Sequence, residues 1–147
     1  MTAEITKLLL IEDDPEDAEL FRALLSEDKL HAFEIEYANR LETGLKRLDS
    51  FKADVLLLDI SLPDSRGLAT FHKAYSRAPG VPIVLLTGLE DEQLALEAVK
   101  NGAQDYLTKR EINGKILSRA DDGLHRGYVA VPAIVGVDHG PRSLGGA

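Results

Sequence analysis

The sequence predicts an α/β protein with a five-stranded parallel sheet and helices on both faces of the sheet. Three observations lead to this prediction: short, nearly continuous apolar runs, helical patterns between them, and a strand–helix order that repeats five times. Because crossovers between parallel strands are right-handed, the intervening helices are distributed over both faces. The result is a three-layer sandwich.

The predicted strands differ in how apolar they are. Residues 7–11, 55–58 and 83–86 are strongly apolar runs, and 105–108 is a weaker one. Such runs are typical of strands that are buried on both faces of a parallel sheet. Residues 33–37 instead alternate apolar with acidic residues, which indicates a strand with one solvated face. We therefore place 33–37 at an edge, which favours the strand order 2-1-3-4-5 of a flavodoxin-like (βα)5 fold.

Helical spacing of apolar residues fills the segments between the strands. Pro15 suits the first turn of the first helix, Pro79-Gly80 would stop the third, and Gly102 is placed to cap the fourth. The apolar stripes of the five predicted helices are Ala18-Phe21-Leu24-Leu25, Leu41-Leu45-Leu48, Leu68-Phe71-Tyr75, Leu94-Ala95-Ala98-Val99 and Ile112-Ile116-Leu117-Ala120-Leu124.

Length and composition exclude several classes of protein. The chain has 147 residues, no cysteine and a formal net charge of −8. One domain is therefore expected, without disulfides or a cysteine-based zinc site, and the negative charge disfavours direct binding of nucleic acid. No apolar run is long enough to cross a membrane, and residues 1–7 are too polar for a signal peptide, so we expect a cytoplasmic protein.

The pattern of strands and helices ends near residue 126. We expect a single folded domain over residues 5–126. Residues 127–147 are rich in glycine and contain two prolines, which is typical of a flexible tail or linker.

Polar residues follow the predicted strands at their carboxyl ends, where ligands bind in open parallel sheets. Glu12 and Asp13 follow the first strand, Asp59 the third, Thr87 the fourth and Lys109 the fifth. Several carboxylates in one partly dry site repel one another, so either one carboxyl is protonated or a divalent cation such as Mg²⁺ binds among them. With the threonine and the lysine on the same edge, the cluster can also receive a phosphoryl group on an aspartate.

Four segments, LLLIEDDPEDAEL, VLLLDISLPDSRGL, VLLTG and NGAQDYLTK, occur in this order at the ends of predicted strands. Together they make residues 7–126 similar to the receiver domain of bacterial two-component response regulators. The resemblance implies that Asp59 is the phosphoacceptor, that Asp13 binds Mg²⁺ directly and that Glu12 binds it through water. It also implies that the backbone carbonyl of Ser61 is a metal ligand, whereas Asp14 is a loop carboxylate.

The resemblance further implies a conformational switch. Thr87 matches the switch hydroxyl, Lys109 the phosphate-binding lysine and Tyr106 the switch aromatic. Phosphorylation would then remodel the face formed by the fourth helix, the fifth strand and the fifth helix. The implied partners are a histidine kinase or phosphotransfer protein and a downstream effector protein or domain, with a homodimer as a further possibility.

Some features leave alternatives open. Lys109 is followed by Arg110, where many receivers have proline, which favours a receiver-like adaptor that works without phosphorylation as a second hypothesis. A third is a Mg²⁺-dependent phosphatase with an aspartyl nucleophile, although the spacing of haloacid-dehalogenase-like enzymes is absent. Thr87 could also cap the fourth helix, with Glu90 completing a capping box. We expect a signalling domain that is not an enzyme, beyond catalysing its own phosphorylation and dephosphorylation.

Overall fold

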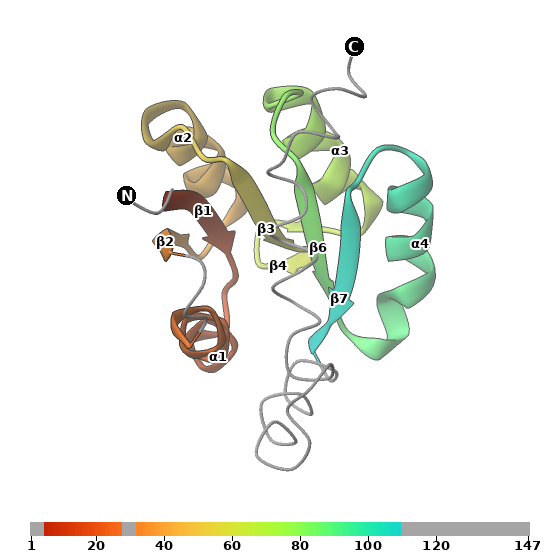
Figure 1. The fold of residues 1–147 in the computed structure, drawn as a ribbon. Coiled ribbons are helices and arrows are strands. Elements are labelled where there is room, and N and C mark those ends of the chain that lie inside the picture. Colours follow the sequence, from red (N-terminus) through yellow and green to blue (C-terminus); the bar gives the residue numbers. More distant parts are fainter. Residues whose placement is uncertain (1–4, 28–31, 110–147) are drawn as a thin grey trace.

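The computed structural model describes residues 5–27 and 32–109, and these contain a five-stranded parallel sheet in the order β2-β1-β3-β6-β7. Figure 1 shows the five strands side by side in this order. The predicted fold class and strand order are therefore confirmed. The strands are β1 (Ile5–Ile11), β2 (Ala32–Ala38), β3 (Val55–Asp59), β6 (Ile83–Thr87) and β7 (Asp105–Thr108).

The strand that alternates apolar with acidic residues lies at the edge, as predicted. β2 pairs only with β1 among the described strands, and its residues are exposed or half-buried except for Ala38. The central strands β3 and β6 are buried at every position. The difference in burial follows from position, because an edge strand is covered less completely than a strand between two neighbours.

A short antiparallel hairpin after β3 was not predicted from the sequence. It consists of β4 (Ser61–Leu62) and β5 (Ser65–Arg66), and the amide of Gly67 donates to the carbonyl of Ile60 at 2.7 Å. Gly67 has a φ of 73°, a conformation that glycine adopts without strain. The hairpin gives the loop next to the end of β3 a defined conformation.

Within the described part of the chain, four α-helices connect the strands, and their ends agree with the local sequence. Asp14 caps the first helix by accepting from the amide of Glu16 at 2.9 Å, and Pro15 occupies the first turn. Gly102, with a φ of 128°, follows the end of the fourth helix as predicted. The helices are α1 (Pro15–Ser26), α2 (Leu41–Phe51), α3 (Leu68–Arg77) and α4 (Glu92–Lys100). The fifth predicted helix and the predicted tail lie outside the described residues, and none of the described helices has the length and apolar character of a membrane span.

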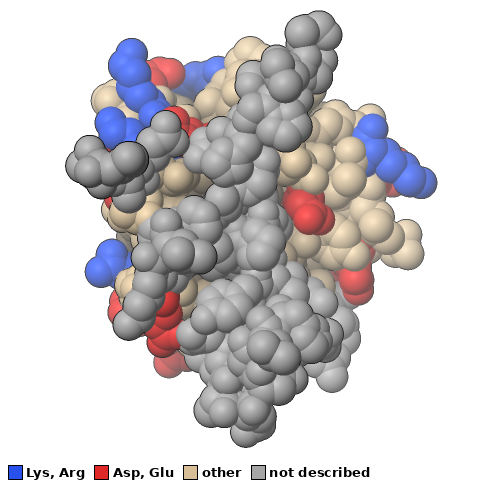
Figure 2. Space-filling model, viewed as in Figure 1, with Lys and Arg blue, Asp and Glu red and all other residues tan. Residues whose placement is uncertain are grey.

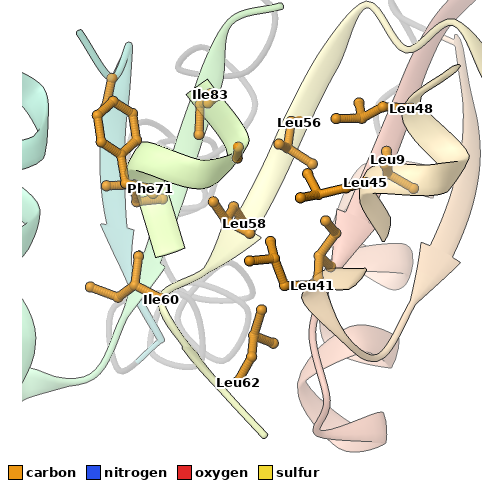
Figure 3. Packing of buried hydrophobic residues seen from close by; sticks show 14 of the residues in the cluster. Leu9, Leu41, Leu45, Leu48, Leu56, Leu58, Ile60, Leu62, Phe71 and Ile83 are labelled. Atoms are coloured by element: carbon orange, nitrogen blue, oxygen red, sulfur yellow. The ribbon is translucent and has the colours of Figure 1, made fainter. Parts of the chain in front are cut away.

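Two apolar cores form because successive side chains of a strand point to opposite faces of the sheet. On one face, strand residues such as Leu9, Leu56 and Leu85 pack with α2, α3 and α4. On the other face, residues such as Leu8 and Leu57 pack with α1. Figure 3 shows part of the first core, where residues of α2 and α3 pack against the sheet. Each fully buried leucine contributes about 1.5–3 kcal/mol through removal of apolar surface from water.

Parallel pairing brings the carboxyl ends of the strands to one edge of the sheet. Asp59 pairs in register with Leu86, and Thr87 pairs with Thr108. Lys109 follows immediately after β7. The polar residues that end β3 and β6, or that follow β1 and β7, are thus placed together by the register of the strands.

Candidate functional site

An acidic cluster lies at the carboxyl edge of the sheet. Glu12, Asp13 and Asp59 each place one carboxylate oxygen within 4.8 Å of the others. Glu12 is 0% exposed and Asp59 is 1% exposed, whereas Asp13 lies at the surface. The cluster therefore has two buried carboxylates and one that faces solvent.

Backbone hydrogen bonds hold the two buried carboxylates in place. The amide of Glu12 donates to the carbonyl of Ala38 at 3.0 Å, which extends the pairing of β1 with β2 by one residue. Glu12 Oε1 accepts from the amide of Asp14 at 3.0 Å. Asp59 Oδ1 accepts from the amide of Ser61 at 2.9 Å. In each of these two side chains, one carboxylate oxygen accepts a hydrogen bond from a backbone amide of the segment that follows the strand. The other oxygen lies next to Lys109 Nζ.

Lys109 neutralises part of this negative charge. Its Nζ donates a hydrogen bond to Asp59 Oδ2 at 2.9 Å and lies 2.8 Å from Glu12 Oε2. A third carboxylate, Asp17 on α1, places Oδ2 3.2 Å from the same nitrogen. One ammonium group thus contacts carboxylates from three separate parts of the chain, namely the loop after β1, α1 and the end of β3.

The electrostatics of the site follow from burial and crowding. Burial, together with the hydrogen bond and charge of Asp59, raises the pKa of Glu12 from 4.5 to about 8, although Lys109 and the Asp14 amide oppose the shift. Burial lowers the pKa of Lys109, but its ion pairs with Glu12 and Asp59 outweigh burial and leave the pKa above its usual value. The lysine stays charged, and the acidic side chains at the site outnumber it.

The donor set fits a hard divalent cation. Three carboxylates converge, and Lys109, which contacts Glu12 and Asp59, is the single described cation that contacts any of them. Clustered carboxylate oxygens are ligands that Mg²⁺ and similar ions prefer. The acidic cluster is therefore able to bind a metal ion, which would offset the repulsion between Asp59 and Glu12 that adds to the effect of burial on the pKa of Glu12.

Thr87 supplies a buried hydroxyl at the same edge. The residue is 0% exposed, and within residues 5–27 and 32–109 its Oγ1 has no hydrogen-bond partner. The alternative prediction that Thr87 caps the fourth helix is wrong, because a 3₁₀ turn (Leu89–Asp91) intervenes and Asp91 occupies the cap position of α4. An unpartnered buried hydroxyl has an energetic cost, so this group is poised to bind an incoming acceptor.

Tyr106 lies on β7, further from the carboxyl edge of the sheet. It is half-buried, and its hydroxyl donates to Glu92 Oε2 at the start of α4, at 2.9 Å. The bond connects the last described strand to α4. Ser61 is also half-buried and lies two residues beyond Asp59, with its amide bound to the Asp59 carboxylate.

Two residues of the site region were not found from the sequence. Asp17 contacts Lys109 from the first turn of α1, and its position four residues after Asp13 is a weak signal that it faces the same edge. Asp64, in the hairpin after β3, accepts from the amides of Leu41 at 2.9 Å and Glu42 at 3.0 Å. It caps α2 across a large sequence separation, and no local pattern predicts such a contact.

Comparison with known families identifies the class of protein to which this fold and site belong. The family model of the response regulator receiver domain matches residues 8–121, so the chain belongs to that family. It is a receiver domain of two-component signal transduction, and the role of the family is to accept a phosphoryl group. Response regulators work with kinases and effector domains.

Individual relatives agree with the family. The chain is 30% identical over 122 residues to the KDP operon transcriptional regulatory protein KdpE of Escherichia coli, covering 83% of the chain and 52% of the relative. It is 31% identical over 125 residues to the probable transcriptional regulatory protein SilR of Salmonella typhimurium, covering 85% and 54%. The chain thus spans about half the length of these curated relatives.

Solved structures show the same fold. A two-component response regulator from Clostridium difficile matches with a TM-score of 0.61 and 27% identity, over 82% of this chain and 98% of that one. A CheY-like response regulator receiver domain protein from Methanospirillum hungatei matches with a TM-score of 0.58 and 26% identity, over 81% and 96%.

Proposed function

We propose that Asp59 accepts the phosphoryl group and that Lys109 and Thr87 bind it. The observation that carries this proposal is the contact between Lys109 Nζ and Asp59 Oδ2 at 2.9 Å, within a cluster that includes Glu12 and Asp13. Asp59 contacts the ammonium directly and ends a fully buried central strand.

Mg²⁺ is the cofactor we assign to the acidic cluster. Asp13 and Asp59 would hold it directly, Glu12 through water, and the backbone carbonyl of Ser61 would be a further ligand. When bound, the ion neutralises oxygens of the phosphoryl group that is transferred. The exposed position of Asp13 leaves one side of the cluster open to solvent, from which a cation and a phosphodonor can enter.

The transfer itself needs only groups that the site contains, plus the donor. A carboxylate oxygen of Asp59 attacks the phosphorus of a phosphohistidine, the P–N bond breaks, and the imidazole leaves with the electron pair of that bond. The negative oxygens of the phosphoryl group then meet the Lys109 ammonium, and Thr87 can donate its hydroxyl hydrogen to one of them. Hydrolysis of the acyl phosphate by water restores Asp59.

The switch follows from the same groups. The phosphoryl group adds a charge of about −1.5 to −2 at neutral pH, and the Thr87 hydroxyl is an unused donor at the end of β6. Movement of Thr87 toward the phosphate would open space for Tyr106, which now bonds to Glu92 of α4. The remodelled face includes α4 and β7 and, by the sequence prediction, the helix beyond residue 109.

In this proposal the chain is a cytoplasmic signalling domain that is not an enzyme toward a separate substrate. It receives phosphate from a histidine kinase or phosphotransfer protein and controls a downstream effector protein or domain, with no direct contact to nucleic acid. The remodelled face would also be the surface through which a homodimer forms. The domain would extend over residues 5–126, followed by a linker over 127–147.

Acetyl phosphate with Mg²⁺ provides a direct test. Intact-protein mass spectrometry should show one added phosphoryl group in the unchanged protein and none in the Asp59→Asn variant. The matched control is Asp54→Asn, which removes a carboxylate just before the opposite end of the same strand, where Asp54 accepts from the amide of Lys7. Equal phosphorylation of Asp59→Asn would refute the assignment of the acceptor.

A further inference from the structure

Asp17 has no role in the chemistry described so far, yet it contacts the lysine on which that chemistry depends. Its Oδ2 lies 3.2 Å from Lys109 Nζ, and its side chain is 20% exposed. The capping of α1 by Asp14 and the proline at Pro15 fix the helical turn that carries it. We propose that Asp17 is a positioning residue that holds Lys109 in the unphosphorylated site and limits how much phosphorylated protein accumulates.

The geometry shows why the contact opposes phosphorylation. An ammonium group has three N–H donors, and Lys109 Nζ already lies within 3.2 Å of carboxylate oxygens of Glu12, Asp59 and Asp17. A phosphoryl group on Asp59 needs at least one of these donors. Any donor still directed to Asp17 is unavailable to it, so the contact favours the unphosphorylated arrangement.

The charge of Asp17 acts in the same direction. Glu12, Asp59 and Asp17 surround a single ammonium group, Asp13 adds a further carboxylate beside Glu12 and Asp59, and acidic side chains also lie over α1 in the lower left of Figure 2. An incoming anion is repelled by a carboxylate that borders the site but is not one of the proposed metal ligands. Because Asp17 is partly buried, solvent screens this repulsion only in part. The inference rests on the proposed function, since it assumes that Asp59 is the acceptor.

Neutralising Asp17 should therefore favour the phosphorylated state. For the Asp17→Asn variant we expect the concentration of beryllofluoride, a stable stand-in for the phosphoryl group, needed for half-saturation with Mg²⁺ to fall about threefold to tenfold. This range corresponds to one partly exposed ion pair. Saturation can be followed by the rise in thermal stability as beryllofluoride is added. The phosphorylated fraction reached with acetyl phosphate should rise in parallel.

Two further variants separate positioning from a general effect of charge. Glu16→Gln removes the same charge from the same turn, but Glu16 forms no ion pair with Lys109 among the described residues, so this variant should resemble the unchanged protein. Asp17→Glu keeps the charge and should also resemble it. The difference between Asp17→Asn and the unchanged protein should shrink as salt is raised, which a purely structural role would not produce.

The outcomes are distinguishable from failure of the proposed function. If the unchanged protein neither binds beryllofluoride nor accepts phosphate, the assignment of Asp59 is wrong. If it does both and Asp17→Asn behaves identically, or binds beryllofluoride more weakly, the role of Asp17 is refuted. An equal gain in Glu16→Gln would show a general charge effect and would also refute it.

Discussion

Replacing Glu12 with glutamine should change the pH dependence of stability in metal-free buffer. The carboxyl of Glu12 is 0% exposed and its pKa is raised from 4.5 to about 8, first by burial and then by Asp59. Below pH 4.5 the group is protonated in both the folded and the unfolded protein. Between pH 4.5 and 8 the unfolded chain loses the proton while the folded protein keeps it, so the free energy of unfolding falls as pH rises and levels off above 8.

The magnitude follows from the size of the shift. At about 1.4 kcal/mol per pH unit, a shift from 4.5 to about 8 corresponds to an upper limit of about 5 kcal/mol of lost stability. The Glu12→Gln variant cannot ionise at this position, and its side-chain oxygen can still accept from the amide of Asp14. The difference in stability between variant and unchanged protein should therefore grow steadily in favour of the variant between pH 5 and pH 8.

Urea unfolding followed by circular dichroism, at several pH values with a chelator present, measures this difference. The matched control is Glu16→Gln, which removes an exposed carboxylate from the first turn of α1. The free energy of unfolding of this variant should depend on pH in the same way as that of the unchanged protein. Addition of Mg²⁺ should reduce the loss at high pH in the unchanged protein, because the cation binds the ionised carboxylates. A difference between Glu12→Gln and the unchanged protein that stays constant with pH would contradict the reasoning.

Three other substitutions test the site and its supports. Thr87→Val removes the buried hydroxyl that no described group satisfies, so it should raise the free energy of unfolding by about 1 kcal/mol in urea titrations. It should also abolish any change in tyrosine fluorescence that the proposed movement of Tyr106 produces when beryllofluoride binds. Lys109→Met leaves the buried Asp59 carboxylate and the buried Glu12 carboxyl group without their ammonium partner and should cost about 3 kcal/mol at neutral pH, with partial recovery in Mg²⁺. Asp64→Ala removes both capping bonds to α2 and should lower the melting temperature, with a cost of about 1–2 kcal/mol. Unchanged stability in either of the last two variants would contradict the assigned contacts.

The pH dependence of the Asp64 cap has the opposite sign to that of Glu12. Burial raises the pKa of Asp64, but the backbone amides of Leu41 and Glu42 outweigh burial and bring the pKa below its ordinary value of 3.8. The stabilisation it provides is therefore complete above pH 3.8 and is lost as pH falls through the lowered pKa.

The sequence by itself determined the order of strands and helices, because burial leaves a direct record in residue type. Continuous apolar runs marked strands such as 55–58 and 83–86, and the alternating segment 33–37 marked the edge. The register of parallel strands then brought Asp59 and Lys109 to one edge of the sheet. The short hairpin after β3 was missed because its two-residue strands are too short to show a period.

The tertiary structure alone decided which partners each polar group has. Lys109 contacts Asp17 as well as the carboxylates predicted for it, Asp64 caps a helix that begins 23 residues earlier, and Thr87 does not cap α4. These contacts depend on how α1 and the hairpin pack against the sheet. Side-chain hydrogen bonds and ion pairs reach only a few ångströms, so they are set by the spatial positions of whole elements, which residue type and spacing along the chain do not encode.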